Sequence, residues 1–108
     1  MSVIVDFSIA PMDKGESVST YVARAVAIIK DSGLAYRMGP MGTSIEGDWD
    51  PVMDVVRQCF EALRCDCNRI TMTIKVDYRR GTSGRLQAKI ASVARKLPDD
   101  GRPFQSSP

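Results

Sequence analysis

The sequence predicts a single α+β domain built on an antiparallel sheet, and two features of its hydrophobic pattern carry that prediction. Apolar and polar residues alternate with a period of two at residues 3–10 and 69–78, which indicates strands near both ends of the chain. Apolar residues recur at spacings of three and four in residues 17–30 and 51–66, which indicates two amphipathic helices. A third stretch with helical spacing, residues 84–97, follows the last strand.

Residues at the predicted helix ends support these boundaries. Ser17 is suited to cap the first helix, and Gly33 can end it in the left-handed conformation. Asp50 followed by Pro51 predicts the start of the second helix, because aspartate caps free N–H groups and proline has a preset φ.

Between the two helices lies a stretch rich in glycine and methionine, residues 36–50. Its pattern predicts a hairpin, with strands at residues 34–38 and 43–47 around a turn at Gly39–Gly42. The resulting order is strand, helix, strand, strand, helix, strand, helix. The first six elements match the ferredoxin-like βαββαβ plan, an antiparallel sheet with two helices on one face, and the seventh is an extra C-terminal helix. We therefore expect one domain over residues 1–97 and a disordered tail over residues 98–108.

The predicted sheet has a second face that the two helices do not cover. Its side chains are mixed in polarity, which is typical of subunit contacts or ligand platforms. We therefore expect an oligomer that uses this open face or the edge strands. The residues assigned to the face are Ile4, Asp6, Ser8, Ser44, Glu46, Thr71, Thr73 and Lys75.

Composition narrows the classes of protein. The 108 residues suffice for one core, and a net charge of +2 is too small to indicate nucleic acid or a membrane surface as partner. No long apolar run and no leader pattern is present, so a cytoplasmic location is expected. Three clustered cysteines, Cys59, Cys65 and Cys67, with no histidine, do not predict a metal site.

The absence of histidine also disfavours catalysis. Without histidine, a general base would need a carboxylate, lysine or thiol with a shifted pKa, and no pair is arranged for that role. No nucleophile elbow, phosphate loop or dinucleotide fingerprint occurs. RNA binding is also disfavoured, since the strand at residues 43–47 has no aromatic residue and carries an acid.

The hairpin holds the best candidates for a small-molecule site. Glu46 can accept hydrogen bonds from an amine, and methionine thioethers pack well against a flat heteroaromatic ring. The structural alternative is that Glu46 is a solvated or cross-strand partner and that the methionines fill gaps. Arg37, Arg79 and Arg80 are interpreted as surface charges.

Three segments of the chain resemble one known family. They are residues 6–11, residues 36–47, which include the run Gly-Thr-Ser-Ile-Glu-Gly, and residues 74–79 followed by Gly84, Arg85, Leu86 and Lys89. In these segments the chain resembles the small thiamine-binding family of YkoF-like proteins over about residues 3–97. The resemblance implies a ferredoxin-like fold, a homodimer or homotetramer, and non-enzymatic binding of thiamine or its hydroxymethylpyrimidine part. The residues it places at the ligand are Ser8, Met38, Met41, Thr43, Ser44 and Glu46.

Two other hypotheses stay open at this stage. The chain could be an oligomeric regulatory or assembly module without a small ligand, or, less in keeping with its residues, an enzyme of thiamine metabolism. Glu46→Gln separates the ligand-binding protein from the assembly module. A structural Glu46 predicts a nearly silent substitution, whereas a ligand role predicts lost binding with little change in stability.

Overall fold

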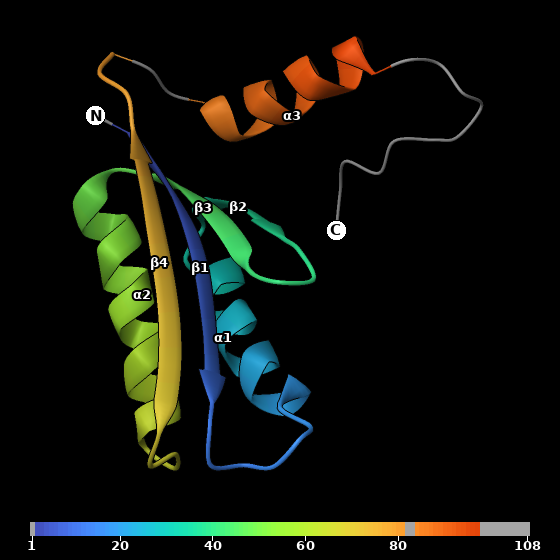
Figure 1. Cartoon of the computed structure of the whole chain (residues 1–108). Coiled ribbons are helices and arrows are strands. Elements are labelled where there is room, and N and C mark those ends of the chain that lie inside the picture. The colour runs from blue at the N-terminus through green and yellow to red at the C-terminus, as the bar shows by residue number, and fades with distance from the viewer. Residues whose placement is uncertain (1, 82–83, 98–108) are drawn as a thin grey trace.

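The computed structural model describes residues 2–81 and 84–97. Within them the chain forms four strands and three helices in the predicted order (Figure 1). Their bounds are β1 Val3–Pro11, α1 Ser19–Asp31, β2 Ala35–Met38, β3 Thr43–Gly47, α2 Trp49–Arg64, β4 Ile70–Tyr78 and α3 Arg85–Lys96. The ferredoxin-like α+β fold with an additional C-terminal helix is thereby confirmed.

The strands form one antiparallel sheet in the order β2-β3-β1-β4. The pairing of β1 with β3 runs from Val3 opposite Gly47 to Phe7 opposite Thr43. The pairing of β1 with β4 continues further, to Pro11 opposite Ile70. As a result, the last part of β1 has a neighbour on one side only.

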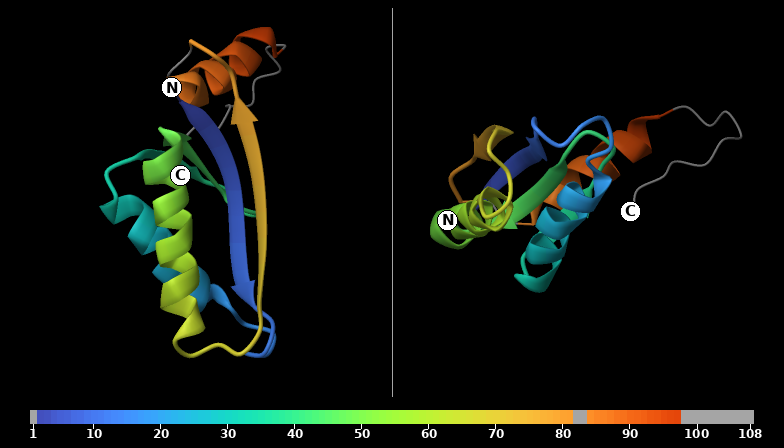
Figure 2. Two further views of the ribbon diagram at one scale, coloured as in Figure 1. Left: turned by 90° about the vertical axis from the view of Figure 1, so that its left-hand side faces the viewer. Right: turned by 90° about the horizontal axis from the view of Figure 1, so that it is seen from below.

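Helices α1 and α2 lie together against one face of the sheet, and α3 lies at one end of the sheet (Figures 1 and 2). The core is the layer between the sheet and α1 and α2. Alternate side chains of β1 enter it, with Val3, Val5, Phe7 and Ile9 all buried, as the period of two predicted. From the helices, the buried residues are Ala25, Ile29, Val52, Val55, Val56, Cys59 and Leu63.

The register also confirms the composition of the open face. Ile4 stands opposite Glu46, Asp6 opposite Ser44, and Ser8 opposite Thr73, so their side chains share the face that α1 and α2 leave uncovered. The first turn of α3 covers one end of this face, where Ile4 and Leu86 are both buried.

Two predicted helix starts differ from the structure. Helix α1 begins at Ser19 after Val18, with no capping side chain, so the predicted cap Ser17 was wrong. Helix α2 begins at Trp49, with Asp48 in the extended N-cap conformation, and not after Asp50. Pro51 is the third helical residue there, where its lack of an N–H group still costs no intrahelical bond. Gly33 has φ +80°, the left-handed conformation expected for a helix terminator.

The expected disordered tail, residues 98–108, lies outside the described residues. The single-domain organisation over residues 1–97 stays a prediction.

Candidate functional site

A cavity of about 310 Å³ lies between α1 and the β2–β3 hairpin, and we call it the hairpin notch. Its floor is apolar, formed by Phe7 of β1 and by one side of α1. The hairpin closes it over Met38–Thr43, with Thr43 as a buried polar residue. The lining residues on α1 are Val22, Ala25, Val26 and Ile29, and those on β1 and β4 beyond Phe7 are Ser8, Ile9, Ala10 and Thr71.

The notch exists because β3 is shorter than β1. The β1–β3 ladder ends at Phe7 opposite Thr43, so residues 8–10 have no β3 neighbour and present a strand edge to the cavity. A free strand edge supplies backbone donors and acceptors to a ligand beside an apolar floor, and small-molecule sites typically combine these two features.

The hairpin turn that borders the notch is held closed by a hydrogen bond from the Gly39 N–H to the Gly42 carbonyl oxygen, at 2.8 Å. Gly42 lies close to β1: a Cβ added there would stand 3.1 Å from the Phe7 carbonyl oxygen and 3.3 Å from Asp6 Oδ1. A side chain at this position would push the turn away from β1, so glycine fixes the shape of the notch.

The structure brings four of the six predicted site residues together. Ser8, Met38, Met41 and Thr43 all line the notch. Met41 is 88% exposed at the tip of the turn, and Met38 is partly exposed beside it. By register, the Ser8 side chain belongs to the open face, so Ser8 contributes to the rim of the notch.

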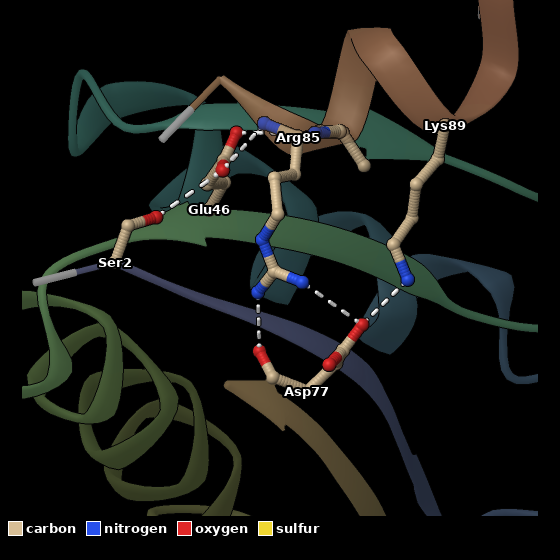
Figure 3. Close-up of polar contacts among 6 residues, drawn as sticks. Ser2, Glu46, Asp77, Arg85 and Lys89 are labelled. Atoms are coloured by element: carbon tan, nitrogen blue, oxygen red, sulfur yellow. Dashed lines mark hydrogen bonds and ion pairs between the residues drawn. The ribbon is translucent and has the colours of Figure 1, made fainter. Parts of the chain in front are cut away.

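The other two predicted residues, Ser44 and Glu46, belong to the open face and are not among the residues that line the notch. Glu46 is buried and contacts α3 (Figure 3). Its Oε2 accepts hydrogen bonds from the Arg85 N–H at 2.8 Å and the Ser2 hydroxyl at 3.2 Å, and its Oε1 accepts one from the Leu86 N–H at 3.2 Å.

Arg85 and Leu86 are the first two residues of α3, whose own N-cap, Gly84, offers no side chain. The Glu46 carboxylate therefore caps this helix from a distant strand, where its negative charge also complements the helix dipole.

A second polar cluster ties α3 to β4 (Figure 3). Arg85 Nη1 donates to Asp77 Oδ2 at 3.2 Å and Arg85 Nη2 donates to the Asp77 carbonyl oxygen at 2.9 Å, while Lys89 Nζ donates to Asp77 Oδ2. The hydrogen bond from Lys89, with smaller contributions from Arg85, lowers the pKa of the Asp77 carboxyl from 3.8. These contacts make the first turn of α3 part of the sheet assembly.

Sequence reasoning missed the α1 side of the notch. Val22, Ala25 and Ile29 belong to the apolar stripe predicted over residues 17–30, but a stripe alone predicts core packing and does not reveal a cavity beside it. The sequence did hold one signal, the unequal length of two predicted strands. The strand at residues 43–47 is too short to pair with all of residues 3–10, so residues 8–10 are left without a neighbour on that side.

The cysteines are unpaired thiols, and no metal cluster was predicted from them. Cys59 is fully buried against α1, and burial raises its pKa to about 11. No group of three potential ligands for a metal ion occurs among residues 2–81 and 84–97. None of the helices in this part of the chain is long and apolar enough to cross a membrane. The cytoplasmic location stays a prediction.

The fold and the notch together define the class of this protein: a ferredoxin-like domain with a small, mostly apolar cavity beside a free strand edge. The particular family follows from comparison with known proteins. A family profile described as "Thiamine-binding protein" matches residues 5–94, and the chain belongs to this family. The family is thus described by binding and not by a reaction.

Individual relatives agree with this assignment. A UPF0045 protein of Mycobacterium tuberculosis is 42% identical over 98 residues, which are 90% of this chain and 96% of the relative. The crystal structure of a hypothetical protein from Methanocaldococcus jannaschii has a TM-score of 0.80 at 29% identity and covers 86% of this chain and 96% of its own. A Thermotoga maritima structure, at 24% identity and a TM-score of 0.77, covers 86% of this chain and 99% of its own and supports the fold alone.

Proposed function

We propose that this protein binds thiamine, or its hydroxymethylpyrimidine part, in the hairpin notch without chemical conversion. The observation that carries the proposal is the notch itself, which gathers four of the six residues named from the family resemblance. Family membership supplies the ligand class.

The size of the notch favours the pyrimidine half. Small-molecule sites typically span about 300–1,000 Å³, so a cavity of about 310 Å³ suits one ring better than two. The ring would lie on the apolar floor with Met38 and Met41 against one face. The Thr43 hydroxyl and the free backbone edge of residues 8–10 would meet its nitrogens. Ser44 and Glu46 lie outside this arrangement, so the proposal rests on the other four residues.

A calorimetric titration tests the proposal. Wild-type protein should bind both thiamine and hydroxymethylpyrimidine. Thr43→Val keeps the shape of the side chain but removes the hydroxyl, and it should lower the affinity for both ligands by roughly five- to tenfold. Val26→Phe places a ring in the notch and should abolish binding while the protein stays folded.

The matched control is Thr73→Val, the same substitution at an exposed β4 residue that does not line the notch, which should leave both affinities unchanged. Two results contradict the proposal: no measurable heat with either ligand, or affinities that neither Thr43→Val nor Val26→Phe alters.

A second candidate function is the assembly module without a small ligand. The specific observation in its favour is the row of apolar side chains on β4, Met72, Ile74, Val76 and Tyr78, which are between 37% and 46% exposed. They belong to the helix-facing side of the sheet, yet they stay open to solvent on an edge strand. We propose a homodimer or homotetramer formed through this edge. Such an assembly is compatible with ligand binding, and if the protein binds no ligand, assembly would be its function.

A further inference from the structure

A second hollow of about 320 Å³ lies on the open face of the sheet, on the other side of the hairpin from the notch. We call it the open-face hollow. It shares only the hairpin residues Met38–Gly42 with the notch, and its remaining lining residues are Asp6, Arg37 and Ser44. Neither the family resemblance nor the proposed function assigns a role to Arg37.

The three polar lining residues stand in one row across the sheet. Arg37 of β2 is opposite Ser44 of β3, which is opposite Asp6 of β1, and Lys75 of β4 completes the row opposite Asp6. Arg37 and Asp6 are the charged residues that line the hollow, whereas Lys75 lies one strand beyond Asp6 and does not line it.

Arg37 is half-buried, and part of its guanidinium lacks hydrogen-bond partners among the described residues. Its Nη2 donates to Gln87 Oε1 of α3 at 3.0 Å. Its Nε and Nη1 are shielded from solvent and have no hydrogen-bond partner in the part of the chain that the structure describes. A guanidinium has five N–H groups and no acceptor, so shielded donors without partners are unfavourable unless an oxygen reaches them.

We propose that the open-face hollow binds the anionic group, a carboxylate or a phosphate, of a small molecule, with Arg37 as the charged donor. The planar guanidinium matches the oxygen atoms of these groups in shape and charge. Ser44, adjacent in the row, supplies a hydroxyl donor, and Pro40 and Met41 of the turn border the remainder of the ligand. This site goes beyond the proposed function, because the notch on the other side of the hairpin supplies no charged side chain.

The site is tested by titrating the protein with inorganic phosphate and, separately, with acetate at constant ionic strength. Amide NMR chemical shifts report binding. At least one probe should shift the amides of Gly42 and Ser44 in a saturable way. Binding of phosphate alone, of acetate alone, or of both supports the site and identifies the anionic group. Arg37→Gln should lower the affinity for the probe that binds by roughly tenfold or more, because it removes a charge-assisted hydrogen bond.

Two controls separate this effect from a general loss of structure or charge. Gln87→Ala removes the same contact to α3 but keeps Arg37, and Arg95→Gln removes a guanidinium from the exposed end of α3. Both should bind within about twofold of wild type. The proposal is overturned if neither probe binds, if Arg37→Gln binds as well as wild type, or if Gln87→Ala weakens binding as much as Arg37→Gln.

Discussion

Glu46 shows how one residue can be read in two ways from its sequence context. A carboxylate between Ile45 and Gly47 on a strand indicates either a ligand acceptor or a solvated side chain. The structure gives it a third role, because both oxygens are engaged by the first turn of α3. No local pattern around residue 46 reveals this, since the partners are 39 and 40 positions further along the chain.

The capping role predicts that Glu46→Gln is not silent. The amide keeps one acceptor oxygen but loses the second and the charge, so the free energy of unfolding should fall by about 1 kcal/mol. Urea unfolding measures the loss, and faster amide exchange at Arg85 and Leu86 locates it. Glu61→Gln is the control: within the described residues the Glu61 carboxylate accepts from Arg64 on the surface of α2, so its loss should cost less than about 0.5 kcal/mol.

Affinity for the ligand of the notch should be unchanged in Glu46→Gln, because Glu46 lines no part of that cavity. The opposite result, lost affinity with unchanged stability, would return Glu46 to the ligand site that the resemblance implies.

At the scale of elements, helix α3 is attached to the sheet by polar contacts more than by apolar packing. Leu86 is buried, but Val93 and Leu97 further along are 54% and 49% exposed. Asp77 therefore helps to hold the first turns of α3 on the sheet, because its carboxylate accepts hydrogen bonds from both Arg85 and Lys89.

The lowered pKa of Asp77 predicts how this attachment depends on pH. A carboxyl whose pKa is lower in the folded than in the unfolded chain contributes stability above its unfolded pKa, and that stability is lost as pH falls through the folded value. Protection of the α3 amides should thus be constant at neutral pH and fall below about pH 3.8. Carboxyl NMR titration should give Asp77 a pKa below its usual value.

Lys89→Gln removes the largest contribution and should raise the Asp77 pKa toward 3.8. Lys75→Gln, on the same strand but absent from the contacts of Asp77, should leave it in place. An Asp77 that titrates at its ordinary value in wild type would show that the Lys89 and Arg85 contacts do not persist in solution.

The elements themselves were largely predictable, and the reason is periodicity. Strand β3 has the predicted bounds, and β4 begins one residue after the predicted start, because alternation along a strand is a local property. Helix starts were less predictable. Ser17 and Asp50 both have capping chemistry, but where a helix begins is decided by packing of its first turn, and neither residue became the cap.

The candidate site was predictable only in part, since it depends on contacts between distant segments. The glycine- and methionine-rich hairpin was found from its composition, and the family resemblance named Met38, Met41 and Thr43 within it. The α1 wall of the notch, the contact of Arg37 with α3 and the Glu46 cap all need the register of the sheet and the position of α3, which periodicity does not provide.

At the scale of the whole molecule, strand β4 is the most exposed part of the sheet. It is nine residues long, lies at the edge of the sheet and contains no proline, so its outer backbone groups form a template for another strand. Among the described residues β1 is its only strand neighbour, and its contacts with α3 are those of Asp77 near its end. A second copy of the chain can satisfy this edge through a two-fold axis.

The sequence of β4 is complementary to itself about Ile74. Antiparallel pairing with a second β4 around this residue places Met72 opposite Val76 and Thr73 opposite Lys75, and like charges do not meet along the nine residues. The apolar row would then continue from one copy to the other. We expect sedimentation velocity at micromolar concentration to report a dimer or a larger even assembly.

Two substitutions at one position test this register. With the axis at Ile74, Thr73→Lys sets two lysines opposite each other and should weaken association, whereas Thr73→Glu faces Lys75 of the second copy and should preserve or strengthen it. Ile74→Lys, which meets its own copy on the axis, should give a folded monomer. Because both substituted side chains, Thr73 and Ile74, are exposed, the monomer fold should survive, with circular dichroism as the check. If Thr73→Lys and Thr73→Glu associate equally, the axis does not lie at Ile74, and if Ile74→Lys associates like wild type, β4 is not the contact. If wild type is itself monomeric, the assembly function fails while the notch is unaffected.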